Sequence, residues 1–233
     1  GMPRGFWLGV GIGLLLVAAA GAVKIALDAR AESLPVYMTV PDWPFTDQEG
    51  RTFWLGQTRG KVVVLGMIYT HCPDICPLIT ARMRELQEQV AAEGLSDQVF
   101  FVTITFDPER DTPEVLRRYA QARKVDFTNW AFLTGDPSTI RHLTEALGIY
   151  TERVYVINGT PVATPGASAG AATYFINHTD RLFLVDRQGR VRALLPGSRT
   201  ELPEAMEKIR RLVRERPASS APLPMGVALR SSF

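Results

Sequence analysis

Both cysteines of this 233-residue chain lie in one short segment, and the position of that segment constrains the fold more strongly than any other feature. Residues 69–77 read YTHCPDICP, with three residues between Cys72 and Cys76. An apolar run at 62–68 precedes them and predicts a buried strand. After them, helical periodicity predicts one apolar face made of Leu78, Ile79, Met83, Leu86 and Val90. The sequence therefore predicts two thiols at a junction between a strand and a helix.

The spacing of the two cysteines permits joint chemistry. Residues four apart share a face of a helical turn, so both sulfur atoms could reach one metal ion or each other. The amino-terminal turn of a helix also favours negative charge and lowers the pKa of a thiol. The alternative is a pair of buried apolar cysteines, which is common for free cysteine. Prolines directly after both cysteines indicate a tightly specified turn and favour a functional pair.

Composition narrows the classes of partner. The net charge is only +2, and no basic cluster is interleaved with aromatic residues, so a nucleic-acid partner is not expected. Two cysteines are too few for a disulfide framework. The composition, 46% hydrophobic and 21% charged, is typical of a globular chain with one domain of about 150–180 residues plus appendages.

The amino-terminal segment has the composition of a membrane helix. Residues 6–23 contain no charged residue, and Arg4 and Lys24 flank them. The length of this apolar stretch is near the lower limit for a spanning helix. A cleavable signal peptide, cut near the run Ala29 to Ala31, is the alternative. The apolar stretch is longer than a usual signal core, which favours a retained anchor at 1–23 and a tether at 24–40. Under either interpretation the rest of the chain crosses the membrane.

The remaining pattern alternates strands and helices. A small hairpin is expected within 42–61, and further strands are expected near 99–105, 130–133, 182–185 and 191–195, with helices between them. Thr112 as N-cap and Pro113 at the first helical position predict the start of one helix, whose apolar face is expected to include Ala122. The last helix, from 202, is expected to turn Val213 inward. The order β-α-β-α-β-α-β-β-α predicts an α/β sandwich with a central mixed sheet over 41–213. Cysteines after the first core strand suggest a thioredoxin-like fold. Residues 158–172 are expected to form a mobile loop and 214–233 a disordered tail.

Two chemistries remain open for the cysteine pair. Dithiol–disulfide exchange is plausible outside the cytoplasm, although the thioredoxin-type motif has two residues between its cysteines rather than three. Thiolates are also soft ligands that suit copper(I), zinc and iron–sulfur clusters. A cluster would normally need four cysteines, and structural zinc would need four protein ligands. A metal would therefore require a further ligand from the three histidines.

The histidines differ in their expected positions. His142 is expected at the surface of a helix, and His71, next to Cys72, is expected to point away from a metal bound by that cysteine. His178 comes shortly before a core strand, in the loop that faces the cysteines of thioredoxin-like folds and usually carries a cis-proline. No proline occurs between Pro165 and Pro196, and His178 lies where the proline would be expected. His178 is the candidate third ligand.

Three segments together resemble the signatures of the Sco/SenC family: YTHCPDICP at 69–77, DPERDTPE at 107–114 and NHT at 177–179. Members of that family are membrane-anchored, thioredoxin-like copper proteins that help assemble cytochrome c oxidase. The resemblance covers about 40–213. It implies that Cys72, Cys76 and His178 bind copper and that Asp107 lies near the site without binding the metal. The family often has Asp where this chain has Asn177, which removes one nearby charge.

The resemblance also implies a function and a location. The expected protein is a metallochaperone of the inner membrane, with one spanning helix and its carboxyl-terminal domain in the periplasm, that delivers copper to the CuA centre of a cytochrome c oxidase subunit. It would need an upstream copper donor and a thiol reductant. The alternative is an enzyme, a thiol–disulfide oxidoreductase that uses Cys72 and Cys76 to reduce the receiving subunit. A peroxidase would need one peroxidatic cysteine near an arginine and leaves the cysteine spacing unexplained.

Overall fold

The computed structural model describes residues 3–31, 33–163 and 173–215, which fall into two units, 1–35 and 36 onwards. The first unit is the helix α1 (Arg4–Ala31). Its stretch Gly5–Asp28, with a mean hydropathy of 2.3 over its most apolar window, is long and apolar enough to cross a membrane, a property that signal sequences share. The helix continues through 24–31, which the sequence analysis assigned to the tether. The predicted tail lies almost entirely outside the described residues.

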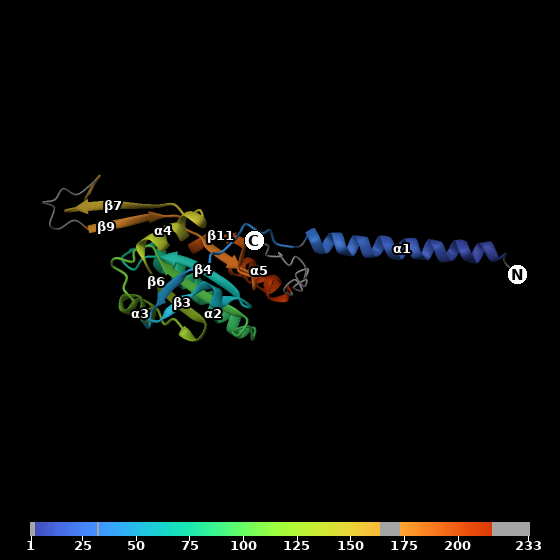
Figure 1. Cartoon of the computed structure of the whole chain (residues 1–233), viewed down its shortest axis with the longest axis horizontal. Helices are drawn as coiled ribbons and strands as arrows, with labels where there is room; N and C mark the ends of the chain where they lie inside the picture. Colours follow the sequence, from blue (N-terminus) through green and yellow to red (C-terminus); the bar gives the residue numbers. More distant parts are fainter. Residues whose placement is uncertain (1–2, 32, 164–172, 216–233) are drawn as a thin grey trace, which may run out of the picture. The chain divides into compact units, whose positions relative to one another are not determined.

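An eight-stranded mixed sheet forms the centre of the second unit, in the order β1-β11-β10-β4-β5-β6-β2-β3 (Figure 1). The strands are β1 (Met38–Thr39), β2 (Pro44–Asp47), β3 (Thr52–Trp54), β4 (Val62–Ile68), β5 (Val99–Thr105), β6 (Trp130–Thr134), β10 (Leu182–Val185) and β11 (Arg190–Leu195). Only the neighbours β4, β5 and β6 run parallel. The α/β fold with a central mixed sheet is thus confirmed, and so is the hairpin expected within 42–61.

The parallel strands need crossover connections, and helices supply them. The helix α2 (Ile75–Ala92) joins β4 to β5, and α3 (Pro113–Ala122) joins β5 to β6. The two helices are neighbours, since the hydroxyl oxygens of Thr80 and Tyr119 lie 3.0 Å apart. Every residue of β4 is buried, as expected for a strand that is covered on both faces. The carboxyl ends of β4 and β5 therefore lie at one edge of the sheet, where α2 and α3 begin.

Two further α-helices lie in the described part of the second unit. α4 (Pro137–Ala146) follows β6, and its first turn is capped by Asp136, whose carboxylate accepts a hydrogen bond from the Ser138 N–H. α5 (Leu202–Arg214) packs against α2. The expected start of α3 is confirmed, because Thr112 accepts the Val115 N–H. Three short 3-10 helices lie at Leu55–Thr58, Phe127–Asn129 and Gly197–Arg199.

The helices are rotated slightly from the orientation that periodicity predicted. Leu78, expected inside, is 56% exposed, whereas the adjacent Ile79 is fully buried. Ala122 is exposed and Val213 only half-buried, so the inward positions of α3 and α5 belong to Ala120 and Leu212. In α2 the inward face instead runs from Cys76 through Ile79, Thr80 and Met83. These three expectations of burial were wrong.

A second sheet, which the sequence pattern did not predict, has three strands in the order β8-β7-β9. Its strands are β7 (Thr151–Ile157), β8 (Thr160–Val162) and β9 (Thr173–His178), and Figure 1 shows β7 in yellow beside β9 in orange. Asn158 and Gly159 form the turn between β7 and β8, with φ of 50° and 79°, the conformation that an Asn-Gly hairpin turn requires. The mobile loop expected at 158–172 is therefore wrong for 160–162, and 164–172 lie outside the described residues. The Gly- and Ala-rich composition obscured the Asn-Gly signal.

The neighbours Leu78 and Ile79 provide a matched test of this packing. Ile79→Ala should lower the free energy of unfolding by about 2–5 kcal/mol, because it leaves a cavity where α2 meets the sheet. Leu78→Ala should change it by only about 0.5 kcal/mol, since that side chain is exposed. Urea denaturation measures both values. Equal losses in the two variants would contradict the observed rotation of α2.

Candidate metal centre

The two cysteines occupy the predicted junction between a strand and a helix. β4 ends at Ile68 and α2 begins at Ile75, so Cys72 lies in the connecting turn and Cys76 in the first helical turn. Asp74 caps the helix by accepting a hydrogen bond from the Ile75 N–H. The turn thus aims one thiol from the loop and one from the helix at the same point.

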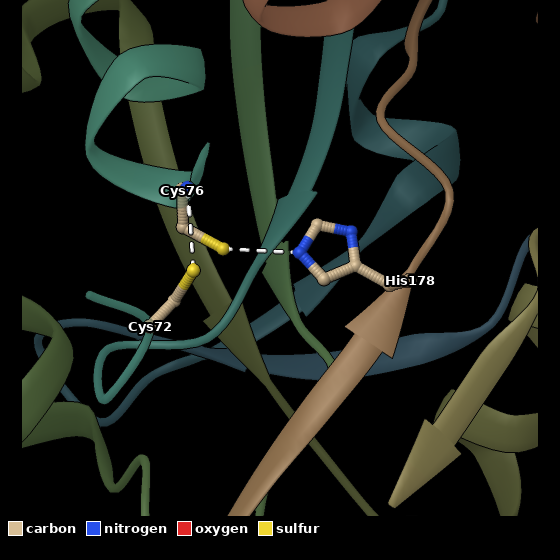
Figure 2. Close-up of side chains that lie close together, drawn as sticks. All are labelled: Cys72, Cys76 and His178. Atoms are coloured by element: carbon tan, nitrogen blue, oxygen red, sulfur yellow. Dashed lines mark hydrogen bonds between the residues drawn. The ribbon is translucent and has the colours of Figure 1, made fainter. Parts of the chain in front are cut away.

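The structure brings His178 to this pair (Figure 2). The Cys76 N–H donates to the Cys72 sulfur at 3.4 Å, and the Cys76 sulfur lies 3.2 Å from Nε2 of His178. The three donor atoms all lie within 4.8 Å of one another. Cys72 is 7% exposed and Cys76 is fully buried. The two cysteines are four residues apart and His178 follows Cys76 by 102 residues, yet the three donor atoms converge on a volume suited to one ion.

The two thiols have opposite electrostatic environments. A hydrogen bond from the Cys76 thiol, opposed by burial, lowers the pKa of Cys72 far below its ordinary value, with help from backbone N–H groups of the turn. Burial, followed by the same contact with Cys72, raises the pKa of Cys76. In the metal-free protein the pair therefore holds one thiolate and one thiol. A metal that binds both sulfur atoms must displace the proton on Cys76.

The orientation of the His178 ring is determined by its neighbours. Nδ1 lies 3.0 Å from the carbonyl oxygen of Thr179, so this nitrogen carries the proton and Nε2 presents its lone pair to the sulfur atoms. The rings of Phe106 and Tyr69 pack against the imidazole, with centroids 4.6 and 6.0 Å away. His178 is the last residue of β9 rather than part of a loop, which corrects the sequence-based expectation. Its position beside the cysteines is nevertheless the one expected.

Tyr69 has a role that the sequence analysis did not assign. Its side chain is buried, and its hydroxyl accepts a hydrogen bond from the Ile176 N–H of β9 at 3.1 Å. Burial, with the nearby sulfur atoms of Cys72 and Cys76, raises the pKa of Tyr69 to about 12. Tyr69 therefore stays protonated and links the cysteine turn to the strand that carries His178. A polar aromatic residue directly after a buried strand was the only signal for it in the sequence.

The other two histidines lie away from the sulfur atoms, as expected. The side chain of His71 is 52% exposed, and its Nδ1 lies 3.9 Å from the Asp111 carboxylate. His142 is exposed on α4, where its ring lies 6.3 Å from that of Trp43. Within the described part of the chain, His178 is thus the histidine that joins the two cysteines.

Two buried carboxylates flank the cysteine turn. Asp107 is fully buried and accepts hydrogen bonds from the Tyr174 hydroxyl, at 2.6 Å, and from Nε of Arg110. Asp111, which the sequence analysis quoted without giving it a role, accepts from the Thr70 N–H at 3.0 Å and from the Thr105 hydroxyl at 2.6 Å. Asp111 therefore fixes the start of the cysteine turn. Asp107 bonds instead to the strand that carries His178.

His71, Asp107 and Asp111 also form a second group of close donor atoms. Both of its carboxylates already accept hydrogen bonds from neighbouring groups, and Asp107 is also paired with Arg110. This group is therefore a hydrogen-bonded support for the turn, whereas the contacts of the two sulfur atoms and of His178 Nε2 are mainly within the cysteine turn and with one another.

A groove of about 800 Å³ opens beside the site. Cys72 and His178 line it, but Cys76 does not. The remaining lining is largely apolar and comes from the cysteine turn and from the second sheet: Tyr69, Pro73, Asp74, Ile75, Val154, Val156, Gly159, Pro161, Thr173, Phe175, Ile176 and Asn177. One side of the donor set is thus accessible from outside, and the other is closed by the core. Two soft sulfur ligands and one imidazole in an open site suit copper(I), whereas structural zinc would be enclosed by four ligands.

Comparison with known proteins gives consistent matches. The family model described as SCO1/SenC matches residues 32–214. A SCO1 protein homolog of Bacillus subtilis is 35% identical over 101 residues, which span 43% of this chain and only about half, 51%, of that protein. A SCO2-like protein of Rickettsia felis is 26% identical over 185 residues, which span 75% of this chain and 82% of that protein.

Solved structures confirm the thioredoxin-like fold that the family matches imply. The copper-bound ScoI of Bradyrhizobium japonicum superposes with a TM-score of 0.59 at 27% identity, over 76% of this chain and 99% of that one. BsSco, described as a cytochrome c oxidase assembly protein with a disulfide switch, gives a TM-score of 0.61 at 25% identity. That match covers 79% of this chain and all of BsSco.

Proposed function

Since the chain belongs to the SCO1/SenC family, we propose that it is a membrane-anchored copper metallochaperone that delivers copper to the CuA centre of a cytochrome c oxidase subunit. One observation carries this proposal. Cys72, Cys76 and His178 come from distant parts of the chain, yet their donor atoms lie within 4.8 Å of one another. The cofactor is copper, which the ScoI structure of Bradyrhizobium japonicum also holds.

The proposed ligands are the sulfur atoms of Cys72 and Cys76 and Nε2 of His178. Thiolates stabilise copper(I), and an imidazole together with thiolates also accommodates copper(II). The Thr179 carbonyl supports this assignment, because it holds the proton on the other ring nitrogen. Asp107 contributes no ligand in this proposal, since its carboxylate is occupied by Tyr174 and Arg110.

Delivery requires an approach to the metal, and the groove beside Cys72 and His178 supplies one. Thiols of a receiving subunit could enter there and replace these two ligands while the buried Cys76 still holds the ion. The largely apolar lining would favour contact with apolar side chains of the receiving subunit. An upstream copper donor would use the same side, and a thiol reductant must keep both cysteines reduced before copper binds.

The proposed location is the inner membrane, with α1 as a single spanning helix and the copper-binding domain on the periplasmic side. The 24-residue apolar stretch Gly5–Asp28 supports this placement. Family members act in the assembly of cytochrome c oxidase, as the description of BsSco states for that family. A tethered domain would meet a membrane-bound oxidase subunit without leaving the surface.

Thiol–disulfide exchange is a second candidate, favoured by the unequal pKa values of the two thiols. Cys72 has the lowered pKa and is the more exposed sulfur, so its thiolate would attack a disulfide of the receiving subunit. A mixed disulfide would form and one partner sulfur would leave as a thiolate. Cys76 would then lose its proton and attack Cys72, which releases the second partner thiolate and leaves a Cys72–Cys76 disulfide. Two electrons pass from the dithiol to the partner.

Copper titration of the detergent-solubilised, reduced chain tests the leading proposal. One copper should bind per chain. Cys72→Ser and Cys76→Ser should each abolish tight binding, and His178→Ala should weaken copper(II) binding by at least about tenfold, or 1.4 kcal/mol, with a changed spectrum. His142→Ala is the matched control and should leave binding unchanged, because its ring lies away from the sulfur atoms.

Two results would contradict the ligand assignment. Unchanged copper binding in His178→Ala would remove that residue from the ligand set. Joining Cys72 to Cys76 as a disulfide removes both thiolates, so the oxidised chain should lose copper binding. If the chain with a confirmed disulfide binds copper as tightly as the dithiol, the thiolate site is wrong.

Trapping experiments test the exchange reaction. With a disulfide-bonded peptide as substrate, Cys76→Ser should accumulate a mixed disulfide through Cys72, because the resolving thiol is absent. Cys72→Ser should trap none, since the remaining thiol is fully buried and has a raised pKa. Mass spectrometry identifies the adduct. Equal trapping by both variants would rule out Cys72 as the attacking sulfur.

Membrane fractionation tests the anchor. The full chain should remain in the membrane pellet after a high-salt wash, with residues 6–23 still attached, because removal of such an apolar helix from lipid is strongly unfavourable. A variant in which residues 1–35 are replaced by a cleavable signal should be released as a soluble domain. A soluble periplasmic form of the natural chain that starts near residue 32 would show that the signal-peptide interpretation was correct.

A further inference from the structure

The two halves of the candidate metal centre belong to different sheets. Cys72 and Cys76 follow β4 of the eight-stranded sheet, whereas His178 ends β9 of the three-stranded sheet. In the described residues, β9 pairs with β7 alone, and no ladder joins the two sheets. The position of the imidazole relative to the sulfur atoms therefore depends on the chain that follows His178 and on side-chain contacts between β9 and the core.

Alternate residues of β9 make these contacts. Tyr174, Ile176 and His178 share one face of the strand, because side chains alternate along a strand. The Tyr174 hydroxyl donates to Asp107, the Ile176 N–H donates to Tyr69, and the His178 imidazole meets Cys76. Tyr174 is about 13 Å from His178 along the strand, so its contact acts well away from the donor atoms.

Arg110 strengthens the contact at Tyr174. Its guanidinium lies 3.6 Å from the centre of the Tyr174 ring, and its terminal nitrogen donates to the Tyr174 carbonyl oxygen at 3.1 Å. Nε of the same side chain donates to Asp107. Because Asp107 is fully buried, water cannot readily replace a lost hydrogen bond to its carboxylate. The ring, the backbone and the hydroxyl of Tyr174 are thus all held by the loop that follows β5.

We propose that Asp107, Arg110 and Tyr174, here called the Tyr174 clasp, are positioning residues that fix β9 against the core and thereby hold the imidazole of His178 over the two sulfur atoms. The copper-related part of this inference rests on the proposed function. Two thiolates alone suit copper(I), whereas copper(II) favours nitrogen ligands such as imidazole. The clasp therefore governs copper(II) retention more than copper(I) retention.

Hydrogen exchange in the metal-free full chain tests the clasp without any copper. Tyr174→Phe keeps the ring but removes the hydrogen bond to Asp107. The amide of Ile176 should then exchange about tenfold faster or more, which is the size expected for one bond to a charged group, while amides in the middle of β4 stay unchanged. The control is Tyr155→Phe, which removes a hydroxyl that interacts with Arg153 on the same strand, β7, rather than with Asp107 in the core.

Copper binding gives the second readout. In Tyr174→Phe, copper(II) affinity should fall about tenfold and its electron paramagnetic resonance spectrum should change, while copper(I) affinity stays within about threefold. Equal losses for both ions, together with a lower melting temperature, would show a general destabilisation and overturn the proposal. Unchanged exchange and an unchanged copper(II) spectrum, or equal effects in Tyr155→Phe, would overturn it as well.

A second variant keeps the test decisive if Tyr174→Phe folds poorly. Arg110→Lys retains a positive charge beside Asp107 but loses the stacking on the ring and the directed bond to the Tyr174 carbonyl. It should show the same faster exchange at Ile176 and the same selective loss of copper(II). If the unmodified chain binds no copper, the proposed function fails, whereas the exchange measurement still decides whether the clasp holds β9.

Discussion

The parallel pairing of β4 with β5 is the constraint on which the site depends. Parallel neighbours place their carboxyl ends at one edge of a sheet, so the cysteine turn after β4 lies beside the loop after β5. Asp111 on the second loop then accepts hydrogen bonds from Thr70 at the start of the first. The backbone of the turn is thereby oriented before any metal binds, and Cys72 and Cys76 are directed to one point.

The environment of the two sulfur atoms connects this geometry to function. The first turn of α2 and the neighbouring thiol stabilise charge on Cys72, whereas burial keeps the proton on Cys76. The pair can therefore take up a soft metal with release of a proton, or attack a disulfide with one sulfur and resolve it with the other. Both proposed reactions would use the open groove beside Cys72 and His178. Metal delivery and thiol exchange are therefore related proposals.

Local patterns predicted much of the architecture. Two strands, β4 and β5, were located from their apolar runs, and the start of α3 from the cap and proline at Thr112 and Pro113. These local signals were sufficient because burial and capping act over a few residues. Periodicity was less accurate within helices, where Leu78 was assigned to the wrong face. The second sheet was missed because β7 and β9 are only partly buried and their pairing joins segments that are distant in sequence. Partly buried strands lack the strong apolar alternation on which such predictions depend.

The amino-acid sequence alone determined the chemistry that is available: two thiols at i and i+4 after a buried strand, a histidine before a later strand, and an apolar helix at the amino terminus. Only the tertiary structure decided which groups support the donor atoms. Tyr69 meets Ile176 and Asp107 meets Tyr174 across 107 and 67 residues of chain. Contacts of that kind arise from the packing of two sheets, and no local preference encodes them, because each partner alone is an ordinary polar residue whose role depends on what the fold brings beside it.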